Sequence, residues 1–262
     1  MVVHQSVVHP HDPLELTELL PGTGWESLGL HVGATEEVEH WWSGGRGERN
    51  LARLVDLLLE TRVTVLDVGR VRLGSALPSD DVHAAHGRVL DLGARFGAQF
   101  VTARFGAPDS PAGRGLAERV DVFGQLAEQA RPYRLRPLLA PVPVDRLDLL
   151  ADAVAVVAPS QGGVVLDVAT SSTTPDQVEE AVDLAWAHLG YLRLSARLAE
   201  SAGEATAGLL RTLPPHVPVA LGGDDSQGLL AEDPARRLRH LHGVVDRMLE
   251  HPRARARRLG GS

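Results

Sequence analysis

The feature that most constrains this chain is the alternation of strand-like apolar segments with helical segments, repeated about eight times over 262 residues. Gly163 to Val168, for example, is a Val/Leu run next to glycines, which is typical of a strand buried on both faces of a parallel sheet. The segments 147–157 and 175–188 flank it and have helical periodicity. This pattern predicts an α/β fold, a single (β/α)8 TIM barrel. A doubly wound open sheet is the alternative, although no Gly-x-Gly-x-x-Gly loop follows a predicted strand.

The predicted boundaries follow from apolar periodicity and from Gly/Pro punctuation. The predicted strands are 2–8, 25–32, 63–68, 99–105, 136–142, 163–168, 191–195 and 217–221. The predicted helices are 14–20, 51–60, 80–96, 116–130, 147–157, 175–188, 205–213 and 234–250, with a polar loop at 36–49. No low-complexity linker divides this pattern, so we predict one domain over residues 1–252. The arginine-rich segment 253–262 is predicted to be a disordered tail.

Two absent residue types exclude whole classes of chemistry. The chain has no cysteine, which excludes disulfides, thiolate metal sites and cysteine nucleophiles and fits a cytoplasmic location. It also has no lysine, so Schiff-base and pyridoxal phosphate chemistry are excluded, and arginine, backbone amides or helix N-termini have to bind any anionic substrate. The net charge of -8 argues against nucleic-acid binding. We also expect no membrane span and no signal peptide, because no suitable apolar run is present.

One carboxylate, Asp167, ends the apolar run of the sixth predicted strand. The carboxyl ends of barrel strands carry the chemistry in this class of fold. A catalytic role for Asp167 and a purely structural role in the turn that follows both stay open.

Four segments together resemble the xylose-isomerase-like barrels, which include sugar phosphate isomerases and epimerases, hydroxypyruvate isomerase, inosose dehydratase and endonuclease IV. The segments are Leu92-Gly93-Ala94 through Gly106, Leu126 through Pro143, Gly163 through Thr170, and Tyr191-Leu192-Arg193-Leu194-Ser195-Ala196. The resemblance covers essentially the whole predicted barrel. It implies a sugar phosphate isomerase or epimerase that transfers a proton beside a substrate carbonyl.

The departures from that family concern its metal site. The resemblance implies a divalent metal held by a glutamate, an aspartate, a histidine or glutamine, and a second glutamate on strands five to eight. This chain has Ala140, Arg193 and Gly222 at three of those positions and keeps only Asp167. A histidine that follows the aspartate in the family is replaced by Thr170. One carboxylate does not hold a divalent cation and an arginine repels one, so we predict no metal and no cofactor.

Arginine is the predicted replacement for the metal. We expect Arg193 to occupy the metal's space, to pair with Asp167 and to hold an anionic or enolate group. Arg104, Arg70 and Arg197 also lie in or after predicted strands and are further candidates for substrate binding. Structural ion pairs with nearby acids are the alternative for each of these arginines.

Histidines and tryptophans complete the candidate site. His4 and His31 lie near the ends of the first two strands and are candidate proton-transfer groups. A divalent metal held by Asp167 with N-terminal histidines (His4, His9 or His11) is the alternative. Trp41 and Trp42 are predicted either to line the substrate site from a glycine-rich loop or to form a homodimer contact. The remaining histidine pair, at positions 83 and 86, is predicted to lie on a solvated helix start.

Two functional hypotheses remain. The first is an isomerase, epimerase or lyase that acts without metal on a small polyhydroxylated or hydroxy-carbonyl substrate, with Asp167 and either His4 or His31 in proton transfer. The second is a degenerate barrel that binds a metabolite or a partner subunit and catalyses no reaction. The fold alone does not separate them.

Overall fold

The computed structural model describes residues 1–7, 13–32, 44–74, 79–105, 115–170, 172–201, 206–208, 210, 213–223 and 233–259; the side chains of 44, 70, 79 and 249–259 are not described. Within this part of the chain eight parallel strands pair in sequence order, and β8 pairs with β1 to close a barrel. The predicted (β/α)8 TIM barrel is therefore confirmed. The strands are β1 (Val2–His4), β2 (Ser27–His31), β3 (Thr64–Leu73), β4 (Phe100–Phe105), β5 (Arg136–Pro143), β6 (Gly163–Val168), β7 (Leu189–Ser195) and β8 (Val219–Gly222).

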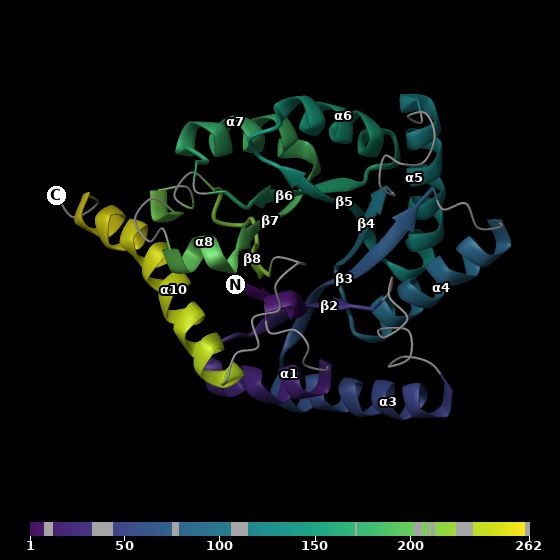
Figure 1. Ribbon diagram of the computed structural model, residues 1–262, viewed down its shortest axis with the longest axis horizontal. Coiled ribbons are helices and arrows are strands. Elements are labelled where there is room, and N and C mark those ends of the chain that lie inside the picture. The colour runs from purple at the N-terminus through teal and green to yellow at the C-terminus, as the bar shows by residue number, and fades with distance from the viewer. Residues whose placement is uncertain are drawn as a thin grey trace.

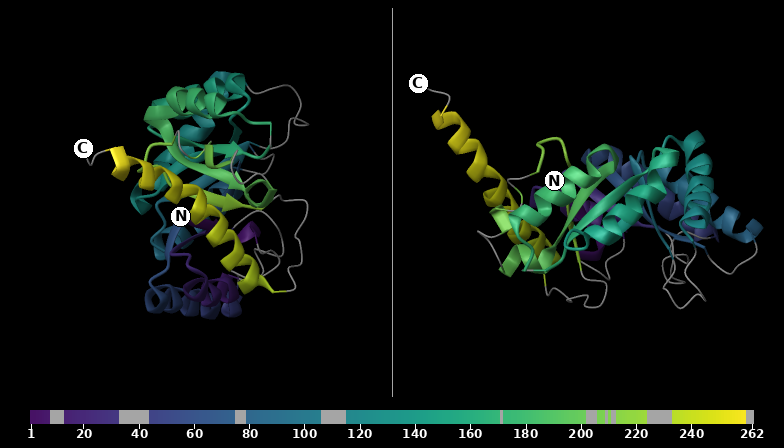
Figure 2. Two further views of the ribbon diagram at one scale, coloured as in Figure 1. Left: turned by 90° about the vertical axis from the view of Figure 1, so that its left-hand side faces the viewer. Right: turned by 90° about the horizontal axis from the view of Figure 1, so that it is seen from above.

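Helices surround the barrel on its outer face, as Figures 1 and 2 show. Among the described residues, no helix combines the length and apolar character needed to cross a bilayer. The helices are α1 (Pro13–Leu19), α3 (Gly44–Thr61), α4 (Ser79–Arg95), α5 (Leu116–Ala130), α6 (Leu147–Val157), α7 (Pro175–Ala185), α8 (Ala196–Ser201) and α10 (Pro234–Leu259).

Several predicted boundaries are confirmed to the residue, namely those of α5, α6 and β6. Other predictions are wrong. The first predicted strand, 2–8, ends at His4, and residues 5–7 form a 3-10 helix. Residues 44–49 belong to α3 rather than to a loop, β3 continues through Leu73, and the short helix α8 follows β7 directly. Arg70 consequently lies inside β3 and not after it.

The last helix is longer than predicted, because α10 continues to Leu259 and includes most of the arginine-rich segment. Its C-terminal end projects away from the barrel in Figure 2. The domain boundary at 252 and the disorder of the tail stay predictions.

The apolar side chains form two separate clusters. The larger cluster lies between the strands and the helices, and β6 contributes Val164, Leu166 and Val168 to it. Val165, on the opposite face of the same strand, belongs to a smaller cluster drawn from the inner face of the barrel. Because β6 is buried on both faces, its sequence is continuously apolar. The smaller cluster comprises Val2, Leu66, Leu138, Val165, Tyr191 and Ala220, with Phe100 and Ala140 packed against it.

The histidine pair on α4 is only partly solvated, contrary to the prediction. His83 is exposed, whereas His86 is half-buried and its Nε2 hydrogen-bonds to the carbonyl oxygen of Arg72 at 3.3 Å. Burial, which outweighs that hydrogen bond, lowers the pKa of His86 below its ordinary value of 6.5. His86 is therefore neutral in the folded protein near neutral pH.

This burial predicts a pH dependence of stability. Below pH 6.5 the unfolded chain takes up more protons at residue 86 than the folded chain, so stability falls as the pH is lowered through that range. We expect the unfolding free energy of the wild type, measured in urea, to fall more steeply between neutral and mildly acidic pH than that of His86→Gln. Parallel curves for the two proteins would contradict this assignment. His83→Gln removes a neighbouring charge that makes a smaller contribution to the same shift than burial does, and it is expected to flatten the curve less than His86→Gln.

Candidate active site

The inner face of the barrel changes from apolar to polar along the strands toward their carboxyl ends. Successive inward positions lie two residues apart in a strand. On β6 and β7 these steps run from Val165 to Asp167 and from Tyr191 to Arg193. The apolar residues of these steps belong to the inner cluster, and the polar residues lie beyond it toward the strand ends. A pocket opens there, lined by His4, His31, Asp67, Thr102, Ala103, Arg104, Ala140, Pro141, Val165, Tyr191 and Arg193.

Asp167 and Arg193 form the ion pair that the sequence predicted. They lie side by side in the register of β6 and β7, and the guanidinium contacts both carboxylate oxygens. Arg193 Nε donates to Asp167 Oδ1 at 2.6 Å, and an Nη donates to Oδ2 at 3.1 Å. The Asp167 side chain is 9% exposed and that of Arg193 is 22% exposed. This two-point contact fixes the guanidinium plane at the edge of the pocket.

Gly222 makes room for that arginine. A Cβ atom at position 222 would lie 2.8 Å from Arg193 Cδ, closer than carbon atoms pack. Gly222 is also the position at which the resemblance places the family's final glutamate. The aliphatic part of Arg193 thus fills space that a glutamate side chain would need, and Ala140, at the position of the first glutamate, lines the same pocket.

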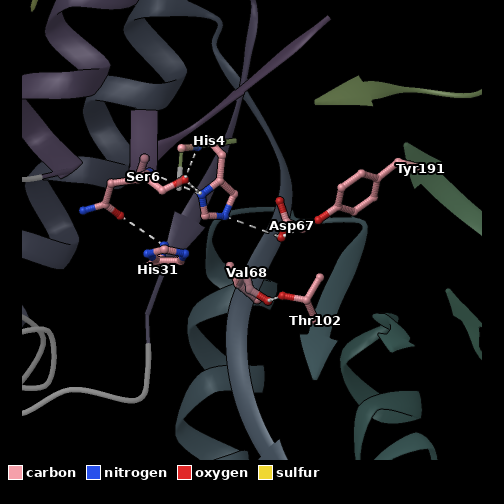
Figure 3. A network of polar contacts seen from close by, with 9 residues as sticks. His4, Ser6, His31, Asp67, Val68, Thr102 and Tyr191 are labelled. Carbon is pink, nitrogen blue, oxygen red and sulfur yellow. Dashed lines mark hydrogen bonds and ion pairs between the residues drawn. The ribbon is translucent and has the colours of Figure 1, made fainter. Parts of the chain in front are cut away.

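A second buried carboxylate, Asp67 on β3, was missed by the sequence analysis. Asp67 is 1% exposed, and its Oδ2 accepts a hydrogen bond from the Tyr191 hydroxyl at 3.1 Å. His4 Nε2 lies 4.0 Å from the same oxygen (Figure 3). A signal was present, because Val65-Leu66-Asp67-Val68 repeats the four residues Val165-Leu166-Asp167-Val168 of β6. Tyr191, two residues before Arg193 on β7, was also missed, because only closure of the barrel brings it next to Asp67.

His4 is held from its other side by Ser6. The backbone N–H of Ser6 donates to His4 Nδ1 at 3.3 Å, and Ser6 Oγ lies 3.1 Å from the same nitrogen. Ser6 Oγ also accepts from the backbone N–H of Gly223 at 2.9 Å, which links the end of β1 to the end of β8. Since Nδ1 accepts from an N–H, the proton of the neutral imidazole lies on Nε2, the nitrogen that faces Asp67.

The predicted site residues divide into three groups. His4 and His31 come together, with ring centroids 4.3 Å apart, and Arg104 lines the pocket with Arg193. Arg197 is exposed on α8 and is not among the residues that line the pocket. Outside the described residues or side chains lie Arg70, Trp41, Trp42, His9 and His11.

The metal alternative gains no support from the described part of the chain. No group of three or more His, Cys, Asp or Glu side chains there is arranged to hold a metal ion. Arg193 lies against Asp167, so a cation at that carboxylate would also face a guanidinium. The predicted independence of metal itself stays a prediction.

The pocket is small. Its volume is about 30 Å³, which corresponds to roughly two water molecules. Between the side chains that the structure describes, it has room for a small polar group.

These features define the class of protein: an α/β barrel of eight parallel strands with a polar pocket at the carboxyl ends of its strands. The chain has the fold of the xylose-isomerase-like TIM barrels, as the resemblance implied. No protein-family model matches the sequence, and a search of curated proteins gives no match.

Solved structures match over nearly the whole chain. A xylose isomerase-like TIM barrel/4-hydroxyphenylpyruvate dioxygenase fusion protein matches with a TM-score of 0.69 at 13% identity, over 99% of this chain and 44% of the fusion protein. The chain thus spans less than half of that protein. D-psicose 3-epimerase in the presence of D-fructose matches with a TM-score of 0.68 at 13% identity, over 94% and 96% of the two chains. Apo 3-keto-D-glucoside 4-epimerase, YcjR, from E. coli matches with a TM-score of 0.67 at 16% identity, over 92% and 97%. Similarity at these identities establishes the fold and not the activity.

Proposed function

We propose that this chain is an isomerase or epimerase that transfers a proton on a small hydroxy-carbonyl substrate bearing an anionic group, and that it uses no divalent metal. The observation that carries the proposal is the pocket itself, which has histidines and a carboxylate from β1, β2 and β3 together with arginines from β4 and β7. Sugar epimerases are among the proteins that share the fold.

The predicted residues at the pocket have the following roles in this proposal. Arg193 and Arg104 bind the anionic group or the enolate that forms in the reaction, and Asp167 orients Arg193 through its two hydrogen bonds. His31 is the candidate base, and it lies next to His4 in the lining of the pocket. The base takes the proton from the carbon beside the carbonyl, the electron pair moves to the carbonyl oxygen, and return of a proton to carbon completes the reaction.

A second candidate function is a binding protein without catalysis. The small pocket volume favours it, because a barrel that has lost its chemistry tolerates a narrow interior. The cytoplasmic location and the homodimer expected from the sequence stay predictions, as do the absence of nucleic-acid and membrane partners.

Hydrogen exchange distinguishes the two functions. We expect the wild-type protein, incubated in D2O with a panel of ketoses, ketose phosphates and sugar acids, to exchange the hydrogen beside the carbonyl of at least one compound, followed by proton NMR. The rate should be the same with and without EDTA, because arginine rather than a metal stabilises the enolate. Exchange that stops in EDTA and returns with Mn²⁺ would refute the metal-free mechanism. No exchange with any compound would favour the binding protein.

A further inference from the structure

We propose that Asp67 and His4 act as one unit that binds a substrate oxygen between Asp67 Oδ2 and His4 Nε2 and accepts its proton on Asp67. This inference rests on the proposed function, since it assigns the hydroxyl-binding and proton-accepting part of the same pocket. It makes Asp67 a catalytic residue, and it changes the role of His4 from a base to a hydrogen-bond donor.

The burial of Asp67 is the first argument. A carboxylate that is 1% exposed inside a barrel has lost most of its hydration, which costs several kcal/mol unless other groups compensate. Asp67 is placed on β3 but contacts Tyr191 on β7 and faces His4 on β1. Figure 3 shows it between these two side chains. Side chains from three strands thus converge on one carboxylate, which lines the pocket.

The fixed orientation of His4 is the second argument. Ser6 contacts Nδ1 with its backbone N–H and its hydroxyl, and that hydroxyl is itself held by the Gly223 N–H. These contacts direct the Nε2–H of the neutral ring toward Asp67. His4 therefore presents its Nε2–H as a hydrogen-bond donor to the pocket. Its position is set by Ser6, which follows β1, and through Ser6 by Gly223, which follows β8.

The distance between the two groups is the third argument. At 4.0 Å, Nε2 and Oδ2 are too far apart for a direct hydrogen bond. An oxygen atom can lie about 2.8 Å from both at once, where it accepts from Nε2–H and donates its own proton to Oδ2. A hydroxyl group fits both requirements, whereas a carbonyl oxygen could only accept.

Gly29 on β2 supports this arrangement. A Cβ atom at position 29 would collide with Asp67 Oδ1 and would lie 2.5 Å from His4 Cδ2. The two side chains therefore need a glycine behind them in order to face each other.

The proton step follows from these contacts. The O–H bond of the bound hydroxyl breaks, its proton forms a bond to Asp67 Oδ2, and the electron pair stays on the substrate oxygen, which His4 Nε2–H stabilises. The proton returns from Asp67 when the oxygen is protonated again. Tyr191 keeps Asp67 in place throughout through its hydroxyl. Of the side chains that the structure describes, His31, Arg104 and Arg193 are the further ionisable ones that line the pocket.

A titration in the absence of substrate tests whether the two groups act as one unit. The His4 signal among the 12 histidines is identified by its loss in His4→Gln, and its pH titration is followed by NMR in the wild type and in Asp67→Asn. We expect the pKa of His4 to be lower by about 1–3 units in Asp67→Asn, since a carboxylate at this distance favours the imidazolium. The control is Asp91→Asn, which removes an exposed carboxylate from α4 and should leave the titration of His4 unchanged. An unchanged His4 titration in folded Asp67→Asn would overturn the proposal.

A measurement on the wild type keeps the test valid if Asp67→Asn does not fold. The ring ¹⁵N shifts of His4 above its pKa should show the proton on Nε2, and a proton on Nδ1 would overturn the proposal.

In the exchange assay, Asp67→Asn should lower turnover by about 10²- to 10⁴-fold while Asp91→Asn stays at the wild-type rate. Turnover within a few-fold of the wild type would remove Asp67 from the reaction. If no compound exchanges in the wild type, the proposed function fails by itself, and the titration still decides whether Asp67 and His4 form one unit.

Discussion

Asp167→Asn and Arg193→Met are each expected to lower the free energy of unfolding by about 3 kcal/mol. Removal of one partner leaves the other charge buried without compensation, which typically costs about 3–5 kcal/mol for a fully buried pair. Arg193 is 22% exposed, so water screens part of this cost and we expect the lower end of the range. Urea denaturation of both variants at neutral pH measures the effect.

A double-mutant cycle separates the pair from the rest of the fold. The double variant should be less destabilised than the sum of the two single variants by about 1–3 kcal/mol, because the second substitution removes a charge already left unpaired. Glu18→Gln is the control, since its ion pair with Arg53 at 3.0 Å is largely exposed and contributes less than about 1 kcal/mol. Additive effects of the two substitutions would mean that the contact contributes nothing to the fold.

The same variants bear on the proposed function. With a compound that undergoes exchange, Arg193→Met should lower kcat/KM by about 10²- to 10³-fold, the usual effect of losing a main donor to a developing anion. Asp167→Asn should cost less, because the arginine remains but is no longer held by two charged contacts. Wild-type turnover in both variants would exclude the pair from the mechanism.

Glycine-to-alanine substitution is expected to have opposite effects at positions 29 and 87. At Gly29 the new methyl group meets Asp67 and His4, two buried side chains in a closed barrel, and such overpacking costs about 1–3 kcal/mol. At Gly87 in α4 nothing lies within 4 Å of the added Cβ, so alanine should stabilise the helix by about 0.5–1 kcal/mol. Thermal and urea unfolding of the two variants measure both changes.

The position-29 variant also has a local consequence. Because the added methyl group displaces Asp67 or His4, Gly29→Ala should change the His4 titration, and Gly87→Ala should not. Equal stability of the two variants would show that the barrel interior adjusts more freely than its packing indicates.

Much of the barrel was predictable because its signals are local. The run at 163–168 is apolar throughout since both of its faces are buried, and the boundaries of β6, α5 and α6 follow from residues within those segments. One error came from reading composition alone. Residues 44–49 have the glycines and charges of a loop, yet they form the first turns of the amphipathic helix α3.

The candidate site was predictable in part. Asp167 was identified because it ends an apolar run, and Arg193 because the resemblance places it where the family has a metal ligand; their pairing was predicted and follows from neighbouring positions in the register of β6 and β7. Asp67 was not identified, because its partners lie 63 residues before it and 124 residues after it in the chain. The four residues that Asp67 shares with β6 mark a carboxylate at the end of an apolar run, but they do not indicate its burial or its two partners.

By itself the sequence determined the strand and helix periodicity, the absence of cysteine and lysine, and the presence of Ala140 and Gly222 where the resemblance expects glutamates, and these features limit both the fold and its chemistry. Only the tertiary structure decided which side chains share the pocket. Closure of the barrel brings β1, β3 and β7 around one interior, so that His4, Asp67 and Tyr191 meet across distances that no sequence pattern encodes. The physical reason is that local periodicity determines which face of a strand is buried, whereas ring closure and register determine which buried faces oppose each other.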